Sequence, residues 1–312
     1  MLTDTSIELR SAKPSLLLRG IKWLLGRRKP VFPQTESGVK AFLEGRALPE
    51  DDPLPENFEK RFIVEHWQAS GQKVITLHPK AGPGDWHMLY FHGGGFILPM
   101  MGVHWTLAAA MVDHCGISIS LPLYDVVPEA SYKAQDDCAD AAFAKIASEH
   151  DPSKIILNGD SAGGHMALAL ALRLAKAGGA QPGKLALFAP WLDVTMQDDA
   201  MQGVEPHDFI LKIEALRAFG EAFAGDRDPA SAQCSPLYTS NADLSQLPST
   251  RIWTGRHDLF IVDSRTFVGR LRDAGVDAKL YEYEAAPHVF MVIVPTRESK
   301  DTIALLRDFL SE

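Results

Sequence analysis

Residues 154–177 read KIILNGDSAGGHMALALALRLAKA: a strand pattern, a glycine-rich turn and a helix pattern in direct succession. The apolar run before the turn predicts a strand, and the Ala- and Leu-rich run after it predicts a buried helix. Between them, glycines stand two residues before and two residues after Ser161. A strand-to-helix turn this tight leaves no room for side chains at those two positions, and it exposes the serine hydroxyl above the sheet. The stretch therefore predicts a nucleophilic serine.

Apolar runs and helix patterns alternate on both sides of this turn. Strand candidates lie at 62–67, 73–78, 88–91, 117–121, 154–158, 185–188, 251–254 and 279–283, and helix candidates at 135–146, 165–177, 213–223, 264–274 and 296–310. The alternation predicts an α/β fold with a mainly parallel sheet. The first two runs have no helix between them, so they predict an antiparallel hairpin that turns near Ser70 and Gly71. Residues 30–55, rich in proline and acid, predict an extended connection before the compact body.

Composition excludes several classes of protein. With 46% hydrophobic and 23% charged residues among 312, the chain resembles an ordinary globular protein rather than a disordered or collagen-like one. The net charge of −9 repels phosphate backbones, so no nucleic-acid partner is expected. Three widely spaced cysteines lack the Cys/His pattern of a zinc site and favour a reducing compartment. We therefore expect a cytoplasmic protein without a bound metal.

An amphipathic helix is predicted near the start of the chain, at Ser15–Leu25 (SLLLRGIKWLL). Arg19 and Lys22 interrupt this stretch well short of the roughly 20 apolar residues that a membrane span needs, so no stable membrane insertion is expected. The leucines share one face, which favours packing against the protein itself. An in-plane membrane anchor is the alternative, encouraged by the three basic residues at 27–29.

A second glycine-rich turn, HGGGF at 92–96, follows the strand candidate at 88–91. Three consecutive glycines weaken any regular element, so their use is to bring bare N–H groups close to a ligand. An acyl-transfer enzyme needs such donors for the oxyanion of its tetrahedral intermediate. We expect the N–H groups of Gly94, Gly95 and Ala162 to supply them, the last at the start of the helix behind Ser161. His92 is expected to hydrogen-bond the loop backbone.

A serine nucleophile needs a base, and the base needs a carboxylate to orient it. The histidines that follow the turn are His165, His207, His257 and His288. We favour His288 because it comes just after the last strand candidate, at the sheet edge where active sites of open α/β sheets collect. His165 is expected to cap or solvate its helix, His207 to lie in an insertion, and His257 to adjoin the acid.

The orienting acid is expected to be Asp258, which follows the strand candidate at 251–254 and precedes His288. Its rival Asp263 stands at the expected start of the next helix, where an aspartate is a favourable N-cap. Glu282 and Glu284 lie inside or just after the last strand candidate and are further candidates for the acid. Asp160, beside the nucleophile, is expected to point away from the substrate and to be structural.

These residues together resemble the hormone-sensitive-lipase-like branch of the α/β-hydrolases, bacterial esterases marked by H-G-G-G and G-D-S-A-G-G. The similarity extends over about residues 60–310 and includes YDVVPE at 124–129, PWLD at 190–193, SPL at 235–237 and GRHDL at 255–259. The resemblance implies an α/β-hydrolase fold with helices on both faces of the sheet. It also implies a helical cap, here an N-terminal segment at 1–55 and an insertion at 194–225, on a catalytic core at 56–312.

The same resemblance implies a serine carboxylesterase for short- to medium-chain esters, with Ser161, Asp258 and His288 as its triad and Gly94, Gly95 and Ala162 as oxyanion donors. No metal or organic cofactor is implied, and a small-molecule ester is the expected partner. The same machinery would serve an amidase, a formamidase or a lactone hydrolase. Receptors of this fold family lose the triad histidine, which is present here. Expected pocket walls are Trp23, Leu24, Phe32, Phe209 and Phe290, and the oligomeric state stays open, a homodimer included.

Overall fold

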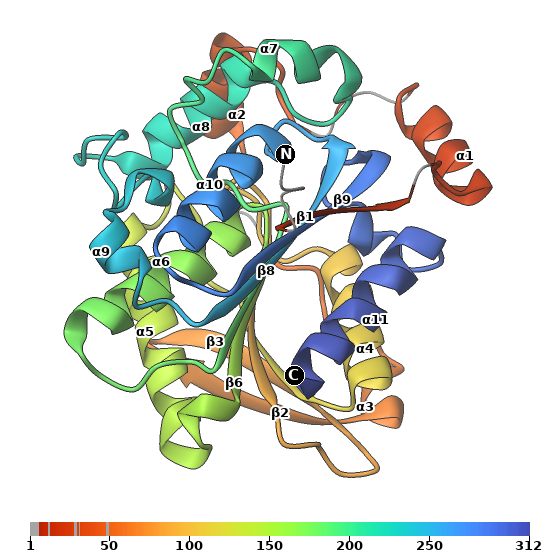
Figure 1. Ribbon diagram of the computed structural model, residues 1–312, viewed down its shortest axis with the longest axis vertical. Helices are drawn as coiled ribbons and strands as arrows, with labels where there is room; N and C mark the ends of the chain where they lie inside the picture. Colours follow the sequence, from red (N-terminus) through yellow and green to blue (C-terminus); the bar gives the residue numbers. More distant parts are fainter. Residues whose placement is uncertain (1–5, 12, 28–29, 31, 48–49) are drawn as a thin grey trace.

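Within residues 6–11, 13–27, 30, 32–47 and 50–312, which the computed structural model describes, nine strands form one sheet with helices on both faces (Figure 1). The strands are β1 (Ile7–Ser11), β2 (Phe62–Ala69), β3 (Gln72–Pro79), β4 (His87–Phe91), β5 (Ser118–Pro122), β6 (Ile155–Asp160), β7 (Lys184–Phe188), β8 (Ser249–His257) and β9 (Ala278–Pro287). Their order is β1-β9-β8-β7-β6-β4-β5-β3-β2. Neighbouring strands are parallel, except that β3 is antiparallel to both β2 and β5.

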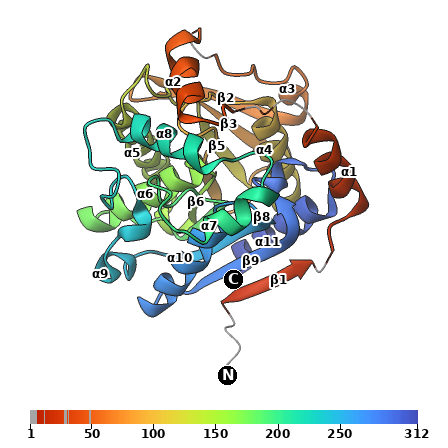
Figure 2. The ribbon, with the colours of Figure 1, turned by 90° about the horizontal axis from the view of Figure 1, so that it is seen from above.

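The α-helices of the described chain connect these strands or lie over their carboxyl ends. They are α1 (Leu16–Leu25), α2 (Glu36–Gly45), α3 (Phe58–Arg61), α4 (Gly102–Cys115), α5 (Tyr132–Glu149), α6 (Ala162–Ala177), α7 (Met201–Val204), α8 (Ile213–Ala224), α9 (Asn241–Leu244), α10 (Ile261–Asp273) and α11 (Arg297–Ser311). α4 and α11 cover one face of the sheet, α5, α6 and α10 cover the other, and α2, α7 and α8 lie together above the strand ends (Figure 1, Figure 2).

The central strands are buried on both faces, and their side chains divide between two hydrophobic clusters. In β6, Ile155 and Leu157 belong to the cluster under α5, α6 and α10, whereas Ile156 belongs to the cluster under α4 and α11. This division follows from the two-residue period of a strand. It explains why the central strand candidates are unbroken apolar runs rather than alternating ones.

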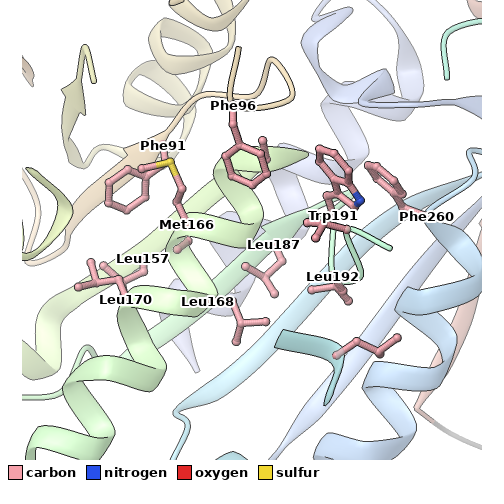
Figure 3. Close-up of a cluster of buried hydrophobic side chains, with 14 of the residues drawn as sticks. Phe91, Phe96, Leu157, Met166, Leu168, Leu170, Leu187, Trp191, Leu192 and Phe260 are labelled. Carbon is pink, nitrogen blue, oxygen red and sulfur yellow. The ribbon is translucent and has the colours of Figure 1, made fainter. Parts of the chain in front are cut away.

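Aromatic rings extend the first of these clusters toward the carboxyl end of the sheet (Figure 3). The ring of Trp191 lies between those of Phe96 and Phe260, with centroids 5.5 and 5.8 Å away. Below them, Met166 on α6 and Leu187 on β7 continue the same packing. The loops that carry these aromatic residues are therefore fixed to the core directly beneath the candidate site.

The eight strand candidates correspond to β2–β9, and the five helix candidates to parts of α5, α6, α8, α10 and α11. The amphipathic helix predicted at 15–25 corresponds to α1. The hairpin of β2 and β3 turns at Ser70 and Gly71, whose φ angles are 49° and 80°, as predicted. α4 was not predicted, because it is buried and apolar around most of its circumference and so lacks a polar face that would mark its period. α2 also lies inside the stretch that was expected to be an extended connection.

β1 corrects the expectation that residues 1–55 form only a helical cap. Residues 7–11 instead add a parallel edge strand to β9, and Arg10 on this strand pairs with Asp301 on α11 at 2.9 Å. The sequence IELRS is short and interrupted by charged residues, so it carries no apolar run. Its partner lies at the other end of the chain, which local patterns cannot reveal.

Candidate active site

Ser161 occupies the turn between β6 and α6, with φ 55° and ψ −119°. A non-glycine residue adopts such backbone angles only where the surrounding structure enforces them. Here a Cβ on Gly159 would lie 2.2 Å from the carbonyl oxygen of Gly163, and one on Gly163 would lie 2.0 Å from that of Phe91. The turn therefore requires both glycines, as the motif predicted. The serine itself is only 6% exposed, because it lies inside a pocket and not on an open surface.

The structure brings the three predicted triad residues together in one hydrogen-bonded series. His288 Nε2 lies 3.0 Å from Ser161 Oγ, and His288 Nδ1 lies 2.9 Å from Asp258 Oδ2. Asp258 follows the strand body of β8 and is completely buried, and its Oδ1 accepts the N–H of Phe260 at 3.0 Å. This geometry favours the tautomer in which Nδ1–H donates to Asp258, so that Nε2 can accept the serine proton.

The glycine-rich loop places its backbone beside Ser161. Gly94 and Gly95 line the same pocket as the serine, and Ala162 begins α6 directly behind it. In the part of the chain that the structure describes, no hydrogen bond uses the N–H groups of these three residues as donors. Donors of this kind next to a nucleophile suit a developing oxyanion.

His92 and Asp160 hold this loop from behind. The hydroxyl of Tyr124 donates to the carbonyl oxygen of His92 at 2.6 Å, and His92 Nδ1 lies 2.8 Å from the carbonyl oxygen of Gly93. Asp160 Oδ1 accepts the N–H of Gly93 at 3.0 Å and the hydroxyl of Tyr90. A Cβ on Gly93 would lie 2.2 Å from Asp160 Oδ2, so only glycine fits there. Both side chains support the loop, as predicted. Asp160 also lines the pocket, however, whereas it was expected to point away from the substrate.

Charges around His288 favour its protonated form. Burial alone would lower the pKa of this imidazole, but the Asp258 carboxylate, with Asp208 and Asp160 farther away, outweighs burial and raises the pKa above its ordinary value. A protonated His288 cannot accept the proton of Ser161. Hydrolysis should therefore fall as the pH drops through this raised pKa.

Asp208 is a site residue that the sequence did not reveal. It precedes α8 in the segment above the strand ends, and it is 2% exposed. Its Oδ1 accepts the N–H groups of Ile210 and Leu211 at 2.8 and 2.9 Å, and its Oδ2 accepts the N–H of Leu259, the neighbour of Asp258, at 3.1 Å. Burial and the nearby Asp258 carboxylate raise the pKa of Asp208. No motif marks it as part of the site, because Leu259 and Asp258 become its neighbours only in the folded chain.

Asp208→Asn should shift the pH dependence of hydrolysis to lower pH. Removing this negative charge takes away part of what raises the pKa of His288, so the imidazole stays unprotonated at lower pH. The measurement is kcat/KM for a soluble ester as a function of pH. Asp199→Asn, an exposed carboxylate on the same segment, is the matched control and should leave the profile in place. A shift to higher pH would contradict the charge effect.

A pocket of about 430 Å³ opens over Ser161. Its walls come from the glycine-rich loop, the segment before α2, the start of α4, the region around α8, and the loop after β9. The apolar residues among them include Leu25, Phe32, Met101, Val103, Trp191, Phe209, Ile210, Leu211, Leu216, Phe219, Val289 and Val292. Phe32 and Phe209 are therefore pocket walls, as predicted.

Three of the predicted pocket walls are wrong. Phe290 is completely buried in the core, where its ring centroid is 4.5 Å from that of Tyr283. The left-handed backbone conformation of Val289 turns Phe290 away from the pocket, and Val289 itself lines the pocket. Trp23 is 61% exposed and Leu24 is 47% exposed. On α1 the residue that faces the pocket is Leu25, about 200° around the helix from Trp23.

The histidine and the aspartate that competed most closely with the triad residues lie elsewhere. His165 neither caps nor solvates its helix. It is buried edge-on against the stacked rings of Phe96 and Phe223, and its Nδ1 is 3.1 Å from the carbonyl oxygen of Trp191. Burial lowers its pKa to about 3. Asp263 is not an N-cap, because α10 begins two residues before it, and the carboxyl is buried without a hydrogen-bond partner. Burial raises the pKa of this carboxyl.

Glu282, Glu284, His207 and His257 each have neighbours outside the triad. Glu282 pairs with Arg256 and Arg265, and Glu284 pairs with Arg256. The ring of His207 lies 5.0 Å from that of His257. Among the described residues, no group of three or more His, Cys, Asp or Glu side chains could hold a metal ion.

A model of the alpha/beta hydrolase fold family matches residues 88–292. This stretch contains the glycine-rich loop, the turn at Ser161 and all three residues of the hydrogen-bonded series. The chain belongs to this family.

Two solved structures agree with the predicted branch of the family. A hormone-sensitive lipase from a metagenome library has a TM-score of 0.77 and is 26% identical, covering 95% of this chain and 96% of that one. An esterase of the bacterial hormone-sensitive lipase family has a TM-score of 0.79 and 26% identity, covering 96% and 98%. The predicted fold class and family resemblance are thus confirmed.

Curated relatives in this family match over a shorter range. An esterase of Acinetobacter venetianus is 32% identical over 198 residues, which are 62% of this chain and 64% of that protein. The carboxylesterase/phospholipase LipF of Mycobacterium tuberculosis is 29% identical over 251 residues, which are 77% of this chain and 67% of that protein. The chain thus spans less than two thirds of the length of the Acinetobacter relative.

Proposed function

We propose that the protein is a serine carboxylesterase that cleaves short- to medium-chain carboxylic esters through an acyl-enzyme. The observation that supports this most strongly is the hydrogen-bonded series from Ser161 through His288 to Asp258. The names of the relatives, an esterase and a carboxylesterase/phospholipase, support the same class of reaction. No step needs a metal or an organic cofactor.

In the first half of the reaction, Ser161 Oγ attacks the ester carbonyl while His288 Nε2 takes the hydroxyl proton. The carbonyl oxygen becomes an oxyanion, and the N–H groups of Gly94, Gly95 and Ala162 stabilise it. His288 then gives its proton to the departing alkoxide, which leaves as the alcohol. The acyl group remains bound to Ser161 Oγ.

In the second half, His288 takes a proton from water, and the hydroxide attacks the acyl carbon. The tetrahedral intermediate collapses, the carboxylic acid leaves, and the proton returns to Ser161 Oγ. Asp258 holds the imidazole in its tautomer throughout and stabilises the imidazolium that forms in each half.

We assign the role of a cap to α2 and to residues 194–225, which include α7 and α8. α2 packs against α8 above the strand ends (Figure 1). Leu216 and Phe219 on α8 line the pocket, as does Phe32 just before α2. The pocket volume of about 430 Å³ lies toward the small end of the range of ligand sites, about 300–1,000 Å³. A largely apolar pocket of this size favours short and medium acyl chains.

A panel of nitrophenyl esters, lactones and aryl amides tests this assignment. For the esters, kcat/KM should rise with acyl length while each methylene is still buried, by at most about fourfold per methylene, equivalent to about 0.8 kcal/mol. It should fall for chains that exceed the pocket. Ser161→Ala measures the background rate. A higher kcat/KM for a lactone or an aryl amide than for every ester would instead favour a lactone hydrolase or an amidase.

A further inference from the structure

Helix α1 makes polar as well as apolar contacts with the rest of the protein. Leu18 is completely buried. Beside it, Lys22 Nζ lies 3.0 Å from His257 Nδ1 and also donates to the carbonyl oxygen of Ala285. At its start, the N–H and hydroxyl of Ser15 donate to the carboxylate of Glu298, at 2.6 and 2.7 Å. These contacts turn the ammonium group of Lys22 toward the protein, whereas much of the apolar surface of α1 is exposed.

The outward surface, which we call the α1 face, consists of Leu16, Leu17, Trp23 and Leu24. Their exposed fractions are 81%, 47%, 61% and 47%. At 100° per residue these four side chains fall within about 120° of one another around the helix. The amphipathic pattern predicts that the leucines of this helix pack against the protein. Of the described leucines on α1, however, only Leu18 is fully buried. Single exposed apolar residues are common on proteins, whereas four on one short helix form a patch that indicates a partner.

The sequence around α1 is rich in positive charge. Residues 9–35 contain seven lysines and arginines and no aspartate or glutamate, in a chain whose net charge is −9. Arg19 is exposed and lies three and four residues from Leu16 and Trp23, which places it at the edge of the face. The guanidinium of Arg27 lies 3.9 Å from the ring centroid of Trp23. Apolar residues with a tryptophan, bordered by cations, are the composition of helices that lie in an anionic membrane interface.

The C-terminal end of α1 adjoins the pocket. Leu25 and Gly26, at the end of the same helix, line the pocket that contains Ser161, as does Val103, which is 45% exposed. Seen from above the strand ends, α1 lies at the rim of the molecule, apart from α2, α7 and α8 (Figure 2). A surface covering the α1 face would therefore lie beside the pocket opening without displacing these helices.

We propose that the α1 face docks in the plane of an anionic lipid surface, with the apolar side chains among the acyl chains and Arg19 and Arg27 at the phosphate groups. The proposed contact uses one face of one helix. In the described chain, no helix is long and apolar enough to cross a membrane. Esters dissolved in the lipid would then reach the pocket at its opening. The docking does not depend on the proposed esterase activity, since it uses residues outside the pocket.

Sedimentation of the full-length protein with vesicles tests the docking. We expect binding to vesicles of phosphatidylcholine and phosphatidylglycerol, and much weaker binding to phosphatidylcholine alone or at high salt. The double variant Leu17→Ser/Leu24→Ser should lower the partition coefficient by about tenfold or more. Ile63→Ser, which removes a 56% exposed apolar residue from β2, is the matched control and should bind like the unmodified protein. Circular dichroism and thermal unfolding check that each variant is folded.

Quenching of tryptophan fluorescence tests whether Trp23 contacts the acyl chains of the lipid. Brominated acyl chains should quench emission in the unmodified protein, and Trp23→Phe should remove that quenching while it keeps vesicle binding. Absence of binding to anionic vesicles would overturn the proposal. If, in addition, the unmodified protein sediments as a dimer and Leu17→Ser/Leu24→Ser as a monomer, a second copy of this chain covers the α1 face instead.

Discussion

Ser161→Ala is expected to abolish ester hydrolysis, with a loss in kcat on the order of 10⁶, the size of effect known for removal of a triad serine. Among the described residues, the hydroxyl has one hydrogen-bond partner, His288, so the change removes the nucleophile and leaves only His288 Nε2 without its partner. The methyl group of alanine fits where the serine Cβ already lies. Thermal unfolding should therefore stay close to that of the unmodified protein, and labelling by a fluorophosphonate should disappear.

Ser148→Ala, on the exposed side of α5, is the matched control for this experiment. It should keep both turnover and labelling. Because traces of host esterase can mimic weak activity, the rate must be compared with a parallel preparation that lacks the protein. Turnover of purified Ser161→Ala well above that background would mean that another group is the nucleophile.

Asp258→Asn is expected to reduce kcat by about 10⁴ while the pocket keeps its shape. In the folded protein, Oδ1 of this side chain accepts the N–H of Phe260 and Oδ2 faces His288 Nδ1. An asparagine would keep its oxygen on the Phe260 N–H and turn its NH₂ group toward the imidazole. His288 would then carry its proton on Nε2, where it cannot accept the proton of Ser161.

Asp263→Asn, five residues farther along, is the matched control for the acid. Its carboxyl is buried away from the pocket and has no hydrogen-bond partner, so turnover should stay near that of the unmodified protein. Single-turnover measurements with a nitrophenyl ester separate the acylation step from release of the acid. If Asp263→Asn lost more activity than Asp258→Asn, the assignment of the acid would be wrong.

The residues that carry the proposed chemistry were predictable because each lies in a turn that admits few residue types. The turn at Ser161 leaves no room for side chains at Gly159 and Gly163, and the glycine-rich loop leaves none at Gly93. Any chain with this geometry must therefore have glycine at these three positions. His288 and Asp258 follow strands whose apolar runs mark the carboxyl edge of the sheet. Local patterns therefore revealed the triad although 127 positions separate Ser161 from His288.

The pocket walls and Asp208 were not predictable for a different reason. Which side chain of a helix or loop faces the pocket depends on a rotation of the backbone, and a single left-handed residue at Val289 sends Phe290 into the core. α1 illustrates the same limit: its leucines form an amphipathic pattern, but polar contacts with Lys22 and Ser15 decide which face is inside. Asp208 is held in place by backbone N–H groups, and because such groups occur throughout every sequence, no residue type marks its binding partners.

The pairing of β1 with β9 also has a consequence for how the protein is made. Arg10 and Asp301, which join this edge, lie 291 positions apart. A ribosome adds about 5–20 residues per second, so the first strand waits on the order of tens of seconds for its partner to emerge. During that time β1 must stay unpaired or be shielded by a chaperone. Within this chain, the edge strand β1 is thus synthesised long before the strand that it pairs with, and this edge of the sheet is completed only after β9 has been made.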